Sequence, residues 1–286
     1  MAVYKRTYRA YSGEITPRWS RFLILTRYSS RGIFASKILT ALFVVCFFYP
    51  LICVAGLYLN HNVSVLSLLN VQSEQLFAVN GAFFLTFMGA QGFLAFLATA
   101  FIGPNLVSPD LVNNAMPLYF CRPISRGEYV LGRACVILLL LSLITWVPGL
   151  LLFGIETSLS GASWAWTNRS FAFGVVLGSW LWISVLALVA LALSAWVRWK
   201  LVAGALVLGV MFVNSGFAVA INAVMRTDVG NYFDIARLVT TIWANLFGVE
   251  SPTQISTSGA AMALVIICGF CLLLLERKVR AYEVVR

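Results

Sequence analysis

Charge is scarce in this chain: Asp, Glu, Lys and Arg make up 10% of its 286 residues, while 61% are apolar. Soluble globular proteins have about a quarter charged and about half apolar residues. A soluble domain of this length buries only about three-quarters of its unfolded surface, too little to hide so many apolar side chains. The composition also excludes a disordered, nucleic-acid-binding chain, despite the net charge of +10. The chain is therefore predicted to lie in a membrane.

Six apolar runs are long enough to cross a bilayer, since a spanning helix needs about 20 mostly apolar residues. They are residues 38–59, 77–103, 130–154, 171–196, 201–224 and 258–275. The predicted fold class is all-α: a polytopic membrane protein with six transmembrane helices. Residues 1–37 form an N-terminal segment, 38–276 the transmembrane domain and 277–286 a tail.

Basic residues are nearly absent from alternate loops. The loops after the first, third and fifth runs contain only three of the 20 Lys and Arg residues, namely Arg169, Arg226 and Arg237. Cytoplasmic loops of membrane proteins carry an excess of Lys and Arg. The bias predicts a bacterial inner or plasma membrane protein with both termini in the cytoplasm.

Groups that carry catalysis or ion coupling are also missing. The single histidine, His61, cannot form a metal cluster, and no Gly-rich phosphate loop is present. No charged residue lies deep in a predicted run, whereas ion-coupled carriers commonly have one. Cys268 and Cys271 have redox spacing but lie within the sixth run, outside any redox context. We expect a non-enzymatic chain that binds no metal or cofactor, driven, if it moves a substrate, by another subunit.

Neutral polar side chains are the remaining candidates within the spans: Asn80 and Gln91 in the second, Asn214 and Asn222 in the fifth. They either hydrogen-bond neighbouring helices or line a substrate pathway. Gly174 and Gly178 form a small-xxx-small pair, which suits close packing either inside the chain or against another subunit.

The segment before the first span mixes aromatic and basic residues. Trp19 and Phe22 alternate with Arg21 and Arg27, which is typical of a basic amphipathic helix lying at the membrane interface. Binding to anionic lipid alone would explain this pattern.

The second to third spans are joined by a longer inner loop, residues 104–129. Asp110 follows Ser-Pro and is predicted to cap a short helix that runs through Ala115. Pro123 then interrupts regular structure, and Ser125 is a candidate cap for the third span. The loop therefore offers a cytoplasmic partner a short helix with polar and aromatic residues.

This loop resembles the membrane subunit of ABC-2 type ABC transporters, which are type V exporters. The resemblance lies in the Ser-Pro-Asp110 turn and in the block Arg122-Pro-Ile-Ser-Arg126-x-x-Tyr129-x-x-Gly132. The approach to the first amphipathic helix, Tyr11-Ser-Gly-Glu-Ile-Thr-Pro-Arg-Trp19, is similar to the same family.

The resemblance implies a permease without its own ATPase. Two copies, as a homodimer, would each dock on a separate nucleotide-binding subunit that binds ATP and Mg, and would export an amphipathic or lipid-like substrate. The docking and coupling residues it implies are Asp110, Asn113, Arg122, Pro123, Arg126, Glu128 and Tyr129.

An outer segment, residues 226–250, precedes the sixth span. Ile235, Leu238, Val239, Ile242, Trp243 and Leu246 fall on one face of a predicted helix that is too polar to span. The family is similar in placing short outer or re-entrant helices here, although a merely interfacial helix fits as well.

The alternative function is an ATPase-coupled scaffold or force-transmitting component that translocates no solute. An intramembrane enzyme and an ion-coupled carrier fit less well, because the spans lack the groups that both require.

Overall fold

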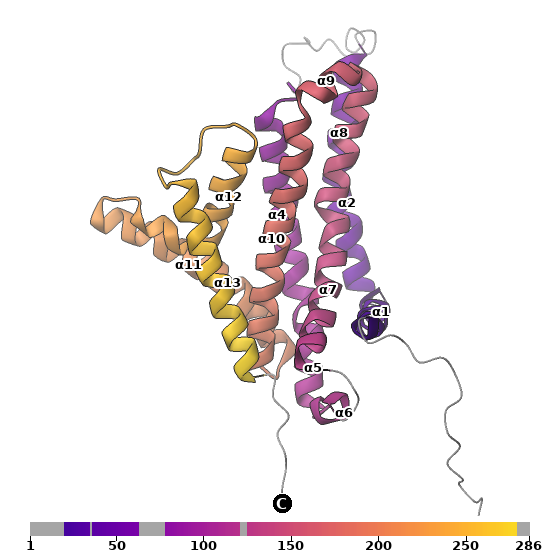
Figure 1. Cartoon of the computed structure of the whole chain (residues 1–286), viewed down its shortest axis with the longest axis vertical. Coiled ribbons are helices and arrows are strands. Elements are labelled where there is room, and N and C mark those ends of the chain that lie inside the picture. The colour runs from indigo at the N-terminus through magenta and orange to yellow at the C-terminus, as the bar shows by residue number, and fades with distance from the viewer. Residues whose placement is uncertain (1–19, 35, 63–77, 121–124, 279–286) are drawn as a thin grey trace, which may run out of the picture.

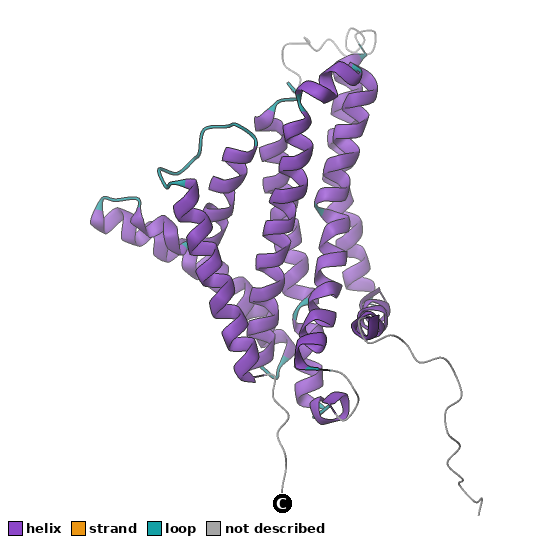
Figure 2. Cartoon of the chain, in the orientation of Figure 1, coloured by secondary structure: helices purple, strands orange, loops and turns teal. Residues whose placement is uncertain are grey.

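The computed structural model describes residues 20–34, 36–62, 78–120 and 125–278, and these residues contain helices but no strand (Figures 1 and 2). Six helical segments are long and apolar enough to cross a membrane, which confirms the predicted spans. They are α2 (Lys37–His61), α4 with α5 (Gly81–Ile102, Pro104–Val112), α7 with α8 (Arg126–Ile144, Trp146–Ser160), α10 (Arg169–Trp196), α11 (Lys200–Met225) and α13 (Thr257–Lys278). The other helices are α1 (Arg21–Phe34), α6 (Met116–Phe120), α9 (Ala162–Thr167), the 3-10 helix η3 (Val229–Phe233) and α12 (Ile235–Leu246).

The two ends of the bundle carry different elements. Helices α1, α5 and α6 lie at one end, here called the α1 end, and α9 lies at the other, the α9 end (Figure 1). Helix α13 finishes at the α1 end, where the Lys278 ammonium lies 5.2 Å from the centroid of the Trp196 ring. The first and last spans thus meet the same end, as an even number of spans requires. That this end faces the cytoplasm stays a prediction.

Helix α10 is the centre of the bundle, packed against α4, α5, α7, α8, α11, α12 and α13. Its buried face includes Ala187, Ala190 and Ala195, whose small side chains let neighbouring backbones approach. At the α1 end the Ser108 hydroxyl on α5 lies 2.9 Å from the carbonyl oxygen of Val197 and 3.1 Å from the hydroxyl of Ser194. These bonds fix α5 to the end of α10.

Two of the spans are bent at identifiable residues. The second changes direction between α4 and α5, where Pro104 follows Gly103, and the third is interrupted at Thr145, three residues before Pro148. The predicted helix capped by Asp110 is wrong. Asp110 lies inside α5, because Pro104 begins that helix earlier and Pro109 is accommodated within its first turns. Ser125 does cap α7, in a capping box with Glu128, as predicted.

Helix α11 runs obliquely away from the other spans, and η3 returns along it toward the bundle (Figure 1). Helix α12 then packs on α10 and α4. A Cβ atom on Gly178 would lie 2.8 Å from the Trp243 ring, and one on Gly174 would lie 2.9 Å from the ring of Phe247. The Trp243 indole nitrogen donates to the Gly178 carbonyl at 3.0 Å. The small-xxx-small pair is therefore used for internal packing, by α12.

Gly178→Leu should displace α12, because its side chain has no space beneath Trp243, and overpacking of this kind costs about 1–3 kcal/mol. Gly209→Leu on α11 is the matched control, since a Cβ there has no atom within 4 Å. We expect the thermal unfolding temperature, followed by tryptophan fluorescence, to fall for Gly178→Leu alone. Equal unfolding temperatures would contradict this packing.

Candidate functional site

Asp110 and Tyr129, two residues that the family resemblance implies, meet at the α1 end. The Tyr129 hydroxyl donates to a carboxylate oxygen of Asp110 at 2.6 Å, and Arg133 pairs with the same oxygen. The guanidinium also lies over the rings of Tyr119 and Tyr129, 5.9 and 5.4 Å from their centroids. Tyr129 is fully buried, and 8% of the Arg133 side chain is exposed. The opposite charges are therefore neutralised within the protein, which a buried ion pair requires.

Helix α1 is joined to this cluster. Arg133 donates to the hydroxyl of Ser29, and the Thr26 hydroxyl donates to the Gly132 carbonyl at 3.0 Å. Gly132 is required for the close approach, because a Cβ there would lie 3.0 Å from the carbonyl oxygen of Phe22. The cluster of Ser29, Asp110, Tyr119, Tyr129 and Arg133, called here the coupling cluster, thus connects α1, α5, α6 and α7.

Three of the other implied docking residues lie at the end of α5 or in the first turn of α7. Asn113 ends α5 and is exposed, as is Arg126 in the first turn of α7. Glu128 is half-buried, and its carboxylate accepts from the backbone nitrogen of Ser125 at 2.6 Å. Arg122 and Pro123 lie outside the described residues.

The interfacial residues predicted before the first span are partly described. Phe22 is half-buried on α1 and Arg27 is exposed. Arg21 is the first residue of α1, but its side chain lies outside the description, and so does Trp19.

The four neutral polar residues do not share one site. The mid-span position predicted for Asn80 is wrong: it caps α4 and accepts from the backbone nitrogen of Phe83 at 3.0 Å, because the helix begins only at Gly81. Gln91 is fully buried and donates to the Cys46 carbonyl on α2 at 3.2 Å. Asn214 lines a cavity of ≈ 530 Å³ between α10, α11 and α13.

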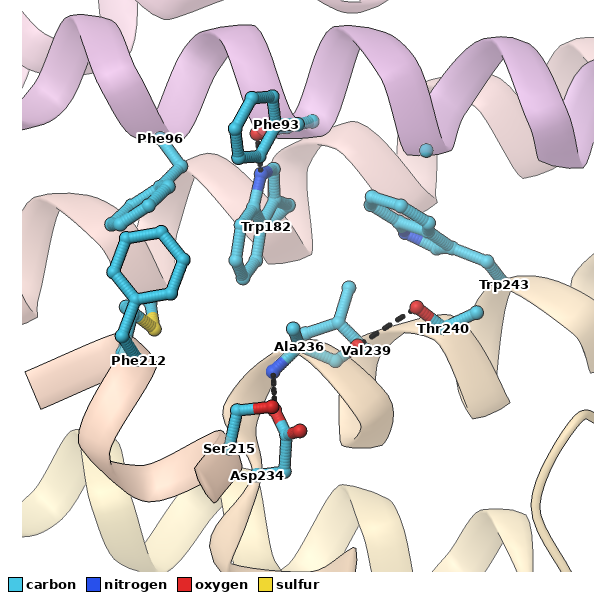
Figure 3. A pocket seen from close by; sticks show the side chains of 13 residues that line it. Phe93, Phe96, Trp182, Phe212, Ser215, Asp234, Ala236, Val239, Thr240 and Trp243 are labelled. Carbon is cyan, nitrogen blue, oxygen red and sulfur yellow. Dashed lines mark hydrogen bonds between the residues drawn. The ribbon is translucent and has the colours of Figure 1, made fainter. Parts of the chain in front are cut away.

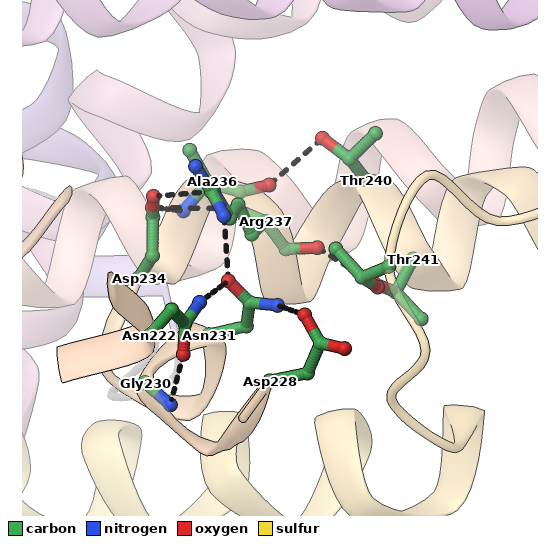
Figure 4. Close-up of polar contacts among 10 residues, drawn as sticks. Asn222, Asp228, Gly230, Asn231, Asp234, Ala236, Arg237, Thr240 and Thr241 are labelled. Atoms are coloured by element: carbon green, nitrogen blue, oxygen red, sulfur yellow. Dashed lines mark hydrogen bonds and ion pairs between the residues drawn. The ribbon is translucent and has the colours of Figure 1, made fainter. Parts of the chain in front are cut away.

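Asn222 belongs to a polar cluster where α11 meets η3 and α12 (Figure 4). Its amide donates to the side-chain oxygen of Asn231 at 2.8 Å, which also accepts from Arg237 at 2.6 Å. Arg237 lies 3.3 Å from the Asp234 carboxylate, and the other oxygen of that carboxylate accepts from the backbone nitrogen of Ala236. Asp234 is buried, so its charge is balanced by Arg237 and by the start of α12.

Asp234 is the most buried charge of this cluster, whereas the Arg237 side chain is 38% exposed. The end of α12 lies beside the start of α4, because a Cβ on Gly81 would meet the Phe247 carbonyl. Farther along α4, a Cβ on Gly92 would meet the Trp243 ring. Gly92 is about 16 Å along α4 from Gly81 at 1.5 Å per residue. Asp234, at the other end of α12, lines a cavity together with Phe96, farther still along α4. The segment after α11 thus folds back against the bundle and brings Asp234 to the level of mid-α4. That it lies on the outer side of the membrane stays a prediction.

The cavity beside Asp234 is small, and five of its thirteen lining residues are aromatic. It has a volume of ≈ 210 Å³, and Trp182, Trp243 and Phe212 form its walls (Figure 3). The two tryptophan rings are T-shaped, with centroids 6.1 Å apart, and the Trp182 indole donates to the Gly92 carbonyl. Ligand pockets usually have volumes of about 300–1,000 Å³, so this space accommodates only part of a larger molecule.

A third polar group lies at the α9 end. Ser160 donates to Glu156 at 2.6 Å, and the His61 ring nitrogen Nε2 lies 3.1 Å from the Ser160 hydroxyl. The Glu156 carboxylate lies 3.6 Å from the same nitrogen, and the other His61 nitrogen lies near the Leu57 carbonyl, so the arrangement differs from a Ser-His-Asp triad, in which serine and carboxylate contact opposite nitrogens. No group of three metal-ligating side chains is found among the described residues.

No protein-family model matches the chain, and no match is found among curated proteins. The functional argument therefore depends on the site residues themselves. The sequence patterns do not single out Arg133 or the Asp234–Arg237 pair as site residues. The spacing of Tyr129 and Arg133, one helical turn apart, was the available signal for the first.

Tyr129→Phe should destabilise the fold, because it removes a buried hydrogen bond to a carboxylate, worth about 1.5–3 kcal/mol. Tyr119→Phe is the control, since the Tyr119 hydroxyl accepts only a long contact of 3.4 Å from Arg133. We expect the unfolding free energy in mild detergent to fall more for Tyr129→Phe. A larger loss for Tyr119→Phe would show that the cluster is not held as described.

Proposed function

We propose that this chain is the permease subunit of an ABC-2 type ABC transporter. It pairs with a second copy in the bacterial inner membrane and couples ATP hydrolysis by separate nucleotide-binding subunits to export of an amphipathic or lipid-like substrate. The observation that supports this most is the coupling cluster: Asp110 and Tyr129, which the resemblance implies from separate parts of the motif, converge on Arg133.

The α1 end has the properties that docking of a cytoplasmic ATPase requires. Asn113 and Arg126 are exposed beside the coupling cluster and are free to contact a partner. Behind them the buried ion pair ties α5 to α7, and Ser108 ties α5 to α10. A displacement of α5 and α6 by the ATPase would therefore move α4, α7 and α10 together, as rigid helices do in coupled transitions.

Helix α1 is the interfacial element of this proposal. One side packs on α7, while Leu23, Ile24 and Arg27 are exposed on the other. Aliphatic side chains beside a cation suit a helix that lies in the plane of the inner membrane surface.

The second permease copy is proposed to cover helices that are least buried by their own chain. Most of α11 and α13 is exposed, including Phe212, Phe217 and Phe270. A tightly closed seam between the two copies would instead favour the alternative, a force-transmitting component.

The first experiment is purification of the tagged full chain from its native host in mild detergent, with identification of copurifying proteins and an ATPase assay. We expect a stoichiometric subunit with a phosphate-binding loop and vanadate-sensitive turnover. A preparation without any ATPase would contradict the proposal. Substrate movement in vesicles containing the complex separates export from force transmission.

Arg126→Glu should reduce the copurifying ATPase by about tenfold or more, because a reversed charge at an interface produces like-charge contacts that cost several kcal/mol. Arg198→Glu is the matched control, an exposed Arg in the α10–α11 turn at the same end. Asp110→Lys is less informative, since it would leave two buried cations facing each other. Full ATPase recovery with Arg126→Glu would exclude docking at this position.

A further inference from the structure

A third cavity lies at the α1 end, where α1 crosses the ends of the spans. Its volume is ≈ 680 Å³, and its lining comes from α1, the start of α2, α5, α6, α7 and the first residue of α11. This volume is within the range of about 300–1,000 Å³ that is usual for ligand pockets. The coupling cluster forms one wall, and Lys200 lies on the lining as well.

The polar wall of this cavity has an excess of positive charge. Arg133 and Lys200 contribute two cations, while Asp110 is the one acidic residue of the lining and is already paired with Arg133. Nε of Arg133 is buried with no hydrogen-bond partner, and Lys200 forms no ion pair within the described part of the chain. Lys200 also begins α11, whose N-cap residue Trp199 makes no side-chain capping bond. An anion here would meet a lysine and a helix N-terminus together.

The rest of the lining combines aliphatic side chains with the polar residues Tyr28, Ser36 and Asn105. The aliphatic ones include Leu25, Ile33, Leu39 and Leu106, and Ile24 at the edge of the cavity is 57% exposed. A free inorganic anion would leave the exposed Ile24 side chain in water, whereas a lipid would place an acyl chain against it. Basic pockets between membrane helices on the cytoplasmic side are suited to anionic lipid headgroups.

We propose that this cavity binds an anionic phospholipid of the inner leaflet. Its phosphate lies at Lys200 and the start of α11, beside Arg133, and its acyl chains lie along Leu25, Ile33 and Leu39. The lipid thereby contacts α1, α2 and α7 at once and supports the position of α1 over the coupling cluster. This site is independent of the proposed ATPase, because every group that forms it belongs to this chain.

The test is a lipid titration of the delipidated full chain by native mass spectrometry, with phosphatidylglycerol and phosphatidylcholine of identical acyl chains. We expect tighter binding of phosphatidylglycerol. Lys200→Gln should weaken it about fivefold, the contribution of one lysine near an anionic headgroup. Arg198→Gln, which removes a neighbouring exposed cation that does not line the cavity, should leave the affinity unchanged.

Three outcomes would overturn the proposal. Equal affinities for the two lipids would show that the headgroup charge is not recognised. Equal losses for Lys200→Gln and Arg198→Gln would indicate general attraction to a basic surface. Complete displacement of phosphatidylglycerol by millimolar inorganic phosphate would identify a free-anion site. Because both substituted residues are exposed, unchanged thermal unfolding of the two variants confirms that folding does not cause the difference.

Discussion

The α1 end of this protein depends on one buried charge. A guanidinium removed from water needs a counter-charge and hydrogen-bond acceptors, and breaking a buried pair is strongly destabilising. Arg133 obtains these from Asp110 on α5 and Ser29 on α1, and its charge also faces two tyrosine rings. Helices α1 and α5 must therefore stay beside α7. Asn113 at the end of α5 and Arg126 at the start of α7 are therefore exposed on helices that are fixed to each other.

A second constraint places charge at the level of mid-α4. Isolated charges are costly inside a membrane, so Asp234 and Arg237 occur as a pair with Asn231 and the α12 N-terminus as further partners. Helix α12 reaches this depth because Gly174 and Gly178 leave room for Phe247 and Trp243. The glycines of α10 thus make this close packing of α12 possible, and the polar cluster is a consequence of that packing.

The sequence predicts what is periodic or local. Hydropathy locates all six spans, helical spacing identifies the face of α12 that is buried, and the Ser125 cap of α7 follows from adjacent residues. Contacts between residues that are distant in the sequence cannot be predicted in this way, because periodicity identifies the buried face of a helix but not the residues that cover it. The coupling of Asp110 to Arg133, the use of Gly178 by Trp243, and the depth of Asp234 all depend on pairings of this kind. The cap formed by Asn80 was missed because an apolar residue preceded it.

Some helices are joined by polar contacts at the α1 end and others are not, and this difference determines how a movement at that end would spread. Helices α5, α7 and α10 are connected there by an ion pair and by the hydroxyl bonds of Ser108, so they move as one body. Helix α11 has little covering from its own chain and leans away from that body (Figure 1). Its polar contacts, through Asn222, lead instead to η3 and α12. If α5, α7 and α10 moved as a rigid body relative to α11, the packing would therefore change around α12. This helix packs on α10 and carries the Asp234–Arg237 pair. This geometry connects the α1 end to the Asp234–Arg237 pair through packed helices.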